Sequence, residues 1–244
     1  MTGTRLEPAT AGRGKLAGSA PVGREAGRPH RRTAVLVGVL FLTSTAAFAV
    51  GSSLVASHIS GDGPAAWTLL AGVLLQVYTG LAVAGIGLAL LPPLRPYNLG
   101  LARAYLALRV LEGSAIVLLG AFMLATSRAL EHDDLVIYSL TAAGGIILSH
   151  LLHGSRLVPR QLAMLGMLGY VALLVGIPAA LLGLADLDAG WGMLFLAPGA
   201  LFELVFPLLL IARGFSVVED VGAQGELGRQ WPMSRSPAST RPLS

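Results

Sequence analysis

The chain has 244 residues, of which 54% are hydrophobic and only 12% are charged, and its mean hydropathy is +0.72. This much apolar surface does not fit inside one water-soluble core of ordinary proportions, so the composition excludes an ordinary soluble domain and predicts a membrane protein. The sequence has no cysteine, which excludes disulfides, thiolate metal sites and thiol nucleophiles. Its net charge of +4 does not predict a nucleic-acid partner, because the arginines gather at the chain ends and in short connections between apolar segments.

The order of polar and apolar segments predicts an all-α bundle of transmembrane helices. Residues 1–33 are rich in Gly, Ala, Pro and Arg without apolar periodicity, and we expect a disordered basic arm there. Apolar segments follow, each close to the ~20 residues that cross a ~30 Å hydrocarbon core. There are six, at residues 34–56, 67–91, 99–126, 135–153, 161–184 and 191–213. Residues 214–244 are polar again and predict a flexible tail.

Basic residues alternate between the connections, and this pattern predicts the orientation. They occur in the N-terminal arm, in the second connection (Arg95 and Arg103), in the fourth (Arg156 and Arg160) and in the C-terminal tail. The first and fifth connections have none, and the third has only Arg128 among acidic residues. Because basic residues beside a membrane helix resist translocation, both ends of the chain are expected in the cytoplasm.

The first apolar segment has an alternative interpretation as a secretory signal peptide. A basic arm precedes it, and Ala47, Phe48 and Ala49 resemble a small-residue cleavage site. The apolar run continues beyond these residues through Val55 to a full spanning length. This continuation favours a helix that stays in the membrane.

Charged residues inside the predicted spans are the candidate functional residues. Tyr105, Arg109 and Glu112 are spaced by four and three, which places them on one face of the third helix. Arg109 lies ~15 Å from the cytoplasmic end, where an arginine costs at least ~2.5 kcal/mol and requires a buried partner. Glu203 lies at a matching depth in the sixth helix. We therefore predict an interhelical ion pair between Arg109 and Glu203, with Glu112 sharing the guanidinium or held protonated.

This charged cluster has two interpretations. Pro207 follows Glu203 by four residues and cannot donate to its carbonyl, which predicts a bend beside a buried carboxylate, as in transporters that hold protons or cations at mid-membrane. The cluster then serves transport of a proton, an ion or a small solute. The other interpretation, a non-enzymatic protein whose charges specify helix packing, is favoured because it needs nothing further from the sequence. The residues expected to support the cluster are Tyr105, Gln76 and Pro207, and other polar residues at similar depth are Thr43, Ser44, Thr45, Thr79 and Tyr170.

No metal, cofactor or enzymatic activity is expected. His150 and His153 are three residues apart, but no cysteine or acidic residue in the adjoining loop completes a metal site. Glu131, His132, Asp133 and Asp134 are expected to form a solvated loop, and weak cation binding there is the lesser alternative. The sequence has no nucleophile, phosphate-loop or zinc-protease motif, so a membrane enzyme that uses His150 near the lipid headgroups is the weakest alternative.

The only partner that the sequence predicts is the lipid bilayer. Arg28, Arg31 and Arg32 precede the first apolar segment. Each contributes roughly 1 kcal/mol when it lies near an anionic lipid surface. The alternative is that these residues act only as the topology signal.

The second half of the chain resembles a known bacterial family. The residues concerned are the run Ser155, Arg156, Leu157, Val158, Pro159 and Arg160, then Leu165 and Gly166, and finally Phe202, Glu203 and Leu204 with Gly214 and Phe215. Together with Tyr105, Arg109 and Glu112 they resemble the family catalogued as domain of unknown function 4386, over about residues 33 to 215. The resemblance implies a compact six-helix domain in the bacterial cytoplasmic membrane and supplies no substrate, reaction or site residues. The family tends to have a tryptophan shortly after Glu203, so the bend at Pro207 is expected to be peculiar to this chain.

Overall fold

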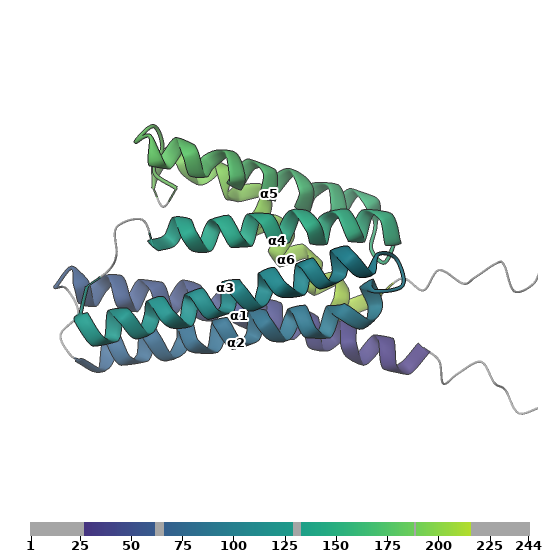
Figure 1. The fold of residues 1–244 in the computed structure, drawn as a ribbon, viewed down its shortest axis with the longest axis horizontal. Helices are drawn as coiled ribbons and strands as arrows, with labels where there is room; N and C mark the ends of the chain where they lie inside the picture. Colours follow the sequence, from purple (N-terminus) through teal and green to yellow (C-terminus); the bar gives the residue numbers. More distant parts are fainter. Residues whose placement is uncertain (1–26, 62–65, 129–132, 188, 216–244) are drawn as a thin grey trace, which may run out of the picture.

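A computed structural model describes residues 27–61, 66–128, 133–187 and 189–215 of the chain. Over these ranges the protein is all-helical, with long helices that run along a common axis as a bundle (Figure 1). In chain order the elements are α1 (Gly27–Ile59), α2 (Ala66–Leu94), α3 (Leu99–Thr126), α4 (Asp133–Ser155), α5 (Arg160–Leu181), the 3₁₀ helix η1 (Gly190–Phe195) and α6 (Ala197–Arg213). The predicted all-α bundle with six spanning helices is confirmed for this part of the chain.

The helices depart most from the predicted segments at two places. α1 begins at Gly27 rather than at residue 34, because a helix continues into basic residues that hydropathy assigns to the arm. The last segment is not one α-helix: η1 ends at Phe195, and α6 begins at Ala197 with Pro198 in its first turn, where a missing N–H costs nothing. Most of the predicted arm and tail lies outside the described residues.

The outward-facing surface of the bundle is apolar. Leu81, Leu118 and Leu168 are 67%, 69% and 62% exposed, on three different helices. In water such a surface would drive aggregation, whereas the hydrocarbon core of a bilayer solvates it. The helices also satisfy their own backbone hydrogen bonds, as a membrane requires.

The bundle consists of two halves of three helices each, α1–α3 and α4–α6. Within each half, helices that are consecutive in the chain pack side by side, and the halves meet along α3 with α4 and along α1 with α6. Exchanging the halves, α1 for α4, α2 for α5 and α3 for α6, reproduces the same set of contacts. We call the end of the bundle that carries Arg95, Arg156 and Arg213 the basic end. The beginning of α1 and the end of α6 both lie at this end (Figure 1).

Glycine contacts bring the helices of each half close together. A Cβ on Gly113 of α3 would collide with the backbone of Gly80 of α2, and a Cβ on Gly169 of α5 would collide with the backbone of Gly199 of α6. Small residues permit this close approach between membrane helices. These contacts lie near Glu112 and Glu203 in the sequence. They therefore hold the two carboxyl-bearing helices, α3 and α6, close to α2 and α5.

The two halves share a core only at the basic end. The large core cluster there contains residues of both halves, among them Phe41 and Leu90 of the first and Leu148 and Phe206 of the second. Toward the opposite end, one small cluster belongs to α1–α3 and another to α4, α5 and the segment that follows α5. The halves are therefore in close apolar contact at the basic end and have separate cores beyond it.

Candidate functional site

A cavity of ≈ 390 Å³ lies between the two halves, in the region where their cores are separate. All six long helices contribute to its wall. The charged lining residues are Arg109, Glu112 and Glu203, and the hydroxyl-bearing ones include Ser44, Thr45, Thr79, Thr141 and Tyr170. Most of the remaining wall is aliphatic or aromatic. Since Ala49 of α1 and Ala200 of α6 line the cavity and are also exposed, the cavity reaches the surface between these two helices.

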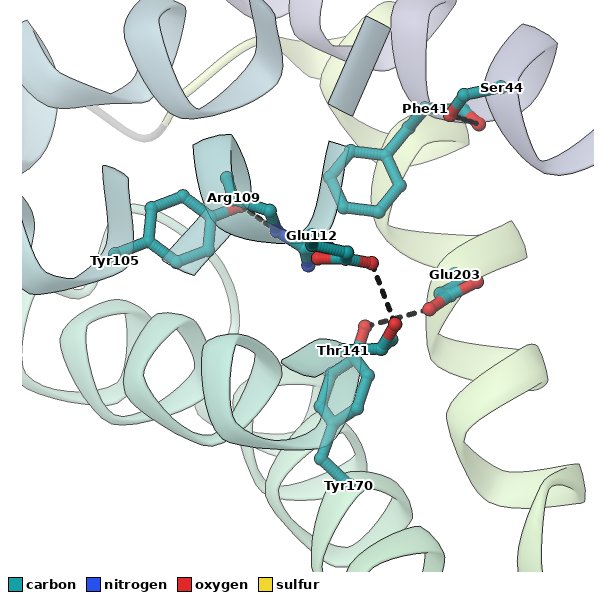
Figure 2. A network of polar contacts seen from close by, with 8 residues as sticks. All are labelled: Phe41, Ser44, Tyr105, Arg109, Glu112, Thr141, Tyr170 and Glu203. Carbon is teal, nitrogen blue, oxygen red and sulfur yellow. Dashed lines mark hydrogen bonds and ion pairs between the residues drawn. The ribbon is translucent and has the colours of Figure 1, made fainter. Parts of the chain in front are cut away.

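One face of α3 carries the charged centre of the site. Tyr105, Arg109 and Glu112 lie on this face, as their spacing predicts, and all three are buried. Arg109 Nη1 forms an ion pair of 2.7 Å with Glu112 Oε2, and Arg109 Nε donates a hydrogen bond of 3.1 Å to the Tyr105 hydroxyl (Figure 2). The guanidinium carbon lies 5.9 Å from the centre of the Phe41 ring and 5.3 Å from that of Tyr105. Aromatic faces at these distances stabilise a buried cation.

Glu112 is fully engaged by two partners. Its Oε2 accepts from Arg109, and its Oε1 accepts a hydrogen bond of 2.6 Å from the Thr141 hydroxyl of α4 (Figure 2). The second bond joins the two halves. Thr141 did not stand out in the sequence, because a single threonine in an apolar helix most often bonds to its own backbone.

The predicted ion pair between Arg109 and Glu203 is wrong. Glu203 Oε1 instead accepts a hydrogen bond of 3.0 Å from the Tyr170 hydroxyl of α5 (Figure 2), and no ion pair of Glu203 occurs among the described residues. The physical reason is local: Glu112 is one helical turn from Arg109, so it pairs with the guanidinium without any interhelical approach. Glu203 lines the same cavity as Arg109 and is only partly buried.

Two adjacent glycines of α4 make room for the site. A Cβ on Gly145 would fall within the ring of Tyr170, and one on Gly144 would lie 3.8 Å from Arg109 Nε. These positions thus admit a side chain from each half, Arg109 from α3 and Tyr170 from α5. Consecutive glycines inside a helix are the sequence signal that identifies such a position.

None of the three predicted supporting residues is among those that line the cavity. Tyr105 accepts a hydrogen bond from Arg109 within α3, and the other two lie at other helix contacts. Gln76 is buried on α2 facing α3, where a Cβ on Gly120 would lie 3.1 Å from its Oε1. Pro207 lies inside α6, which continues through it to Arg213, and its carbonyl would be 2.8 Å from a Cβ on Gly38 of α1. Pro207 therefore belongs to the contact between α1 and α6 at the basic end.

Arg109 also has an unused donor. Its Nη2 is buried and has no hydrogen-bond partner among the residues that the structure describes. A buried guanidinium that lacks one hydrogen bond carries a desolvation cost, which the ion pair to Glu112 and the two aromatic rings offset.

Each of the six spans is long and apolar enough to cross a membrane. With an apolar exterior and charged residues confined to an internal cavity, the chain is a multi-pass helical membrane protein. Residues 132–214 match the model of the family described as Domain of unknown function (DUF4386), which confirms the predicted resemblance over α4 to α6. The match includes Thr141, Tyr170 and Glu203, whereas Arg109 and Glu112 precede it. No curated protein and no solved structure matches the chain.

Proposed function

We propose that this protein is a membrane carrier that binds a small solute in the cavity between its two halves, without a chemical step. The observation that supports this most directly is that Arg109, Glu112 and Glu203 line a cavity of ≈ 390 Å³. Ligand sites in proteins begin at about this size and combine apolar walls with a few polar groups. Charged residues inside a membrane bundle are costly, and a cavity is where they are usually found in transporters.

The arrangement of the halves supports a carrier in particular. Transporters built from two inverted halves bind their substrate at the interface and expose it alternately to each side of the membrane. Here both halves have the same internal contacts and run in opposite directions, and each supplies one carboxyl group, Glu112 from α3 and Glu203 from α6. The cavity extends toward the end opposite the basic end, where the halves lack a shared core.

The orientation proposed for this carrier has both termini in the cytoplasm, which follows from the arginine pattern. Trp67 and Trp191 are both exposed and both lie at the end opposite the basic end, where headgroup-level aromatic rings are expected. In a bacterial cell the membrane would be the cytoplasmic membrane. Arg31 and Arg32 are exposed at the beginning of α1, which supports contact with anionic lipid. Arg28, the third predicted contact, has a side chain outside the described residues.

A packing role is the second candidate function of the cluster. It is supported by two interhelical hydrogen bonds, from Thr141 to Glu112 and from Tyr170 to Glu203. Packing alone does not require the carboxyl of Glu203 to lie beside a cavity. The two candidates therefore differ in whether water and solutes reach Glu203.

Cysteine labelling tests the carrier, because the chain has no cysteine of its own. The variants Ser52→Cys and Ala200→Cys place a thiol on the cavity wall, and Leu118→Cys places one on the apolar exterior as a matched control. In membrane vesicles of known orientation, we expect a membrane-impermeant maleimide to label both cavity positions at least about tenfold faster than Leu118→Cys. Equal, slow labelling at all three positions would contradict a solvent-accessible cavity.

A fourth variant tests whether the halves alternate. Val37 is fully buried in the core at the basic end, and valine to cysteine is a small change. A carrier predicts slow labelling of Val37→Cys from the side of the basic end, because the second state opens the core there. If Ser52→Cys is labelled and Val37→Cys never is, the cavity opens to one side only and the proposed alternation is wrong.

A further inference from the structure

The charges of the cavity wall are unbalanced. Its charged side chains are one arginine and two glutamates, so the wall has one negative charge in excess when all three are ionised. Arg109 and Glu112 neutralise each other at 2.7 Å. The excess charge belongs to Glu203, which has a single hydrogen bond from Tyr170 and no ion pair within the described part of the chain.

A carboxyl group at this depth is either protonated or held beside a counter-charge. Moving an isolated ionised carboxylate from water into an apolar environment costs far more than a protein interior can offset without a partner. Glu203 is partly buried and lines the cavity, so a bound cation can reach it. Arg109 lines the same cavity, but among the described residues its ion pair is with Glu112 and none joins it to Glu203.

The wall chemistry favours an organic cation over an inorganic one. Metal cations such as Ca²⁺ and Mg²⁺ take six or more oxygen ligands. Near Glu203 lie the hydroxyls of Tyr170 and Thr141, each of which already donates to a glutamate (Figure 2). The wall also includes apolar side chains such as Phe48, Leu173 and Leu196. An ammonium group needs only one carboxylate, and aromatic and aliphatic side chains are suitable neighbours for the hydrocarbon attached to it.

We propose that Glu203 binds the ammonium group of a small amphipathic organic cation, whose hydrocarbon part lies against Phe48, Leu173 and Leu196. This assignment rests on the proposed carrier function and names the substrate class of the same cavity. The opening between Ala49 and Ala200 lies on the lipid-facing surface, which gives an amphipathic molecule a route from the bilayer. The site accommodates one positive charge, because Glu203 is the one charged side chain of the described cavity wall that forms no ion pair.

A charge series with a constant hydrocarbon chain tests the assignment. The probes are hexylammonium, hexanol and hexanoate, titrated calorimetrically into purified protein in lipid nanodiscs at neutral pH, with empty nanodiscs subtracted to remove partitioning into lipid. We expect hexylammonium to bind at least about tenfold more tightly than hexanol, and hexanoate to bind more weakly than either.

Glu203→Gln is expected to reduce hexylammonium affinity about tenfold and to leave hexanol affinity unchanged. Ala200→Phe, which fills the opening, is expected to weaken both, and the lipid-facing variant Leu118→Ala to change neither.

The outcomes separate this assignment from the carrier itself. If hexanol or hexanoate binds as tightly as hexylammonium, or if Glu203→Gln leaves the selectivity intact, Glu203 is not an ammonium site. Should Ser52→Cys and Ala200→Cys be labelled rapidly, and Val37→Cys slowly from the side of the basic end, the cavity and the carrier function stand while this assignment fails. Slow labelling together with no selective binding would overturn both. Circular dichroism and thermal unfolding of Glu203→Gln establish that the variant is folded before its affinity is compared.

Discussion

Arg109 and Glu112 form an ion pair of 2.7 Å within a single helix, one turn apart and both almost completely buried. Among the described residues that line the cavity, Arg109 is the one cationic side chain, and this pair engages it. Glu203, on the opposite half, is consequently without a cationic partner among the described residues. Glu112 and Glu203 are both acidic residues inside a span, but they have different partners. Substituting each of them should therefore have a different effect.

We expect Glu112→Gln to lower the stability of the protein strongly and Glu203→Gln to lower it much less. Glu112→Gln leaves Arg109 buried without its counter-charge, and breaking a buried ion pair typically costs ~3–5 kcal/mol. The double variant Arg109→Leu with Glu112→Leu removes both charges and should recover much of this loss. The unfolding temperatures of these variants in detergent measure the differences in stability. If Glu203→Gln lowers stability as much as Glu112→Gln, the assignment of the ion pair is incorrect.

Tyr170→Phe should affect stability only slightly. The substitution removes the hydroxyl that donates to Glu203 at 3.0 Å and leaves the packing of the ring in place. A hydrogen bond of this kind contributes ~1 kcal/mol. We expect a correspondingly small decrease in the unfolding temperature of Tyr170→Phe. Glu203→Leu, which removes the acceptor, should lower the unfolding temperature less in the Tyr170→Phe background than in the original protein, since both changes remove the same bond. Additive decreases would show that the two side chains do not interact.

Gly145→Ala should disrupt the site through Tyr170. The new Cβ would overlap the Tyr170 ring, so either the ring or α4 must move. Overpacking of this kind costs ~1–3 kcal/mol. Combining it with Tyr170→Ala should relieve the clash, and the double variant should be no less stable than Tyr170→Ala alone. Gly154→Ala is the matched control in the same helix, because nothing lies within 4 Å of its added Cβ, and alanine there should be neutral or stabilising. Equal effects of the two alanines would contradict the clash.

Reporter fusions test the orientation. A reporter that is active only in the cytoplasm should be active when fused after Arg160 and inactive when fused after Asp188, because the arginine pattern places the first position inside and the second outside. Substituting Arg95, Arg156 and Arg160 together with glutamine should weaken this preference. The reverse activity pattern would overturn the proposed orientation and would place the cavity opening toward the cytoplasm.

The spans and the polar face of α3 were predictable from the sequence because they depend on local periodicity. A segment of about 20 apolar residues is readable without any knowledge of its neighbours. Likewise, a spacing of four and three places Tyr105, Arg109 and Glu112 on one face of any α-helix. The structure confirms both the six spans and the burial of this face. The family resemblance, too, is confirmed where a run of consecutive residues carries it, in α4 to α6.

The partners of the carboxyl groups were decided only by the tertiary structure. Matching depth made Arg109 and Glu203 candidates for an ion pair, but depth does not determine which helices are neighbours or how their faces turn. Thr141 and Glu112 are 29 residues apart, and Tyr170 and Glu203 are 33 apart, so both contacts depend on packing between helices. The glycines of α4 admit Tyr170, and the separate cores of the two halves leave the cavity, neither of which is visible in a single helix. The sequence by itself determined six segments that are long and apolar enough to cross a membrane, with charged residues inside them, because hydropathy and helical periodicity are local properties. Only the packing of the two halves decided that Glu203 lies beside a cavity and forms no ion pair within the described residues.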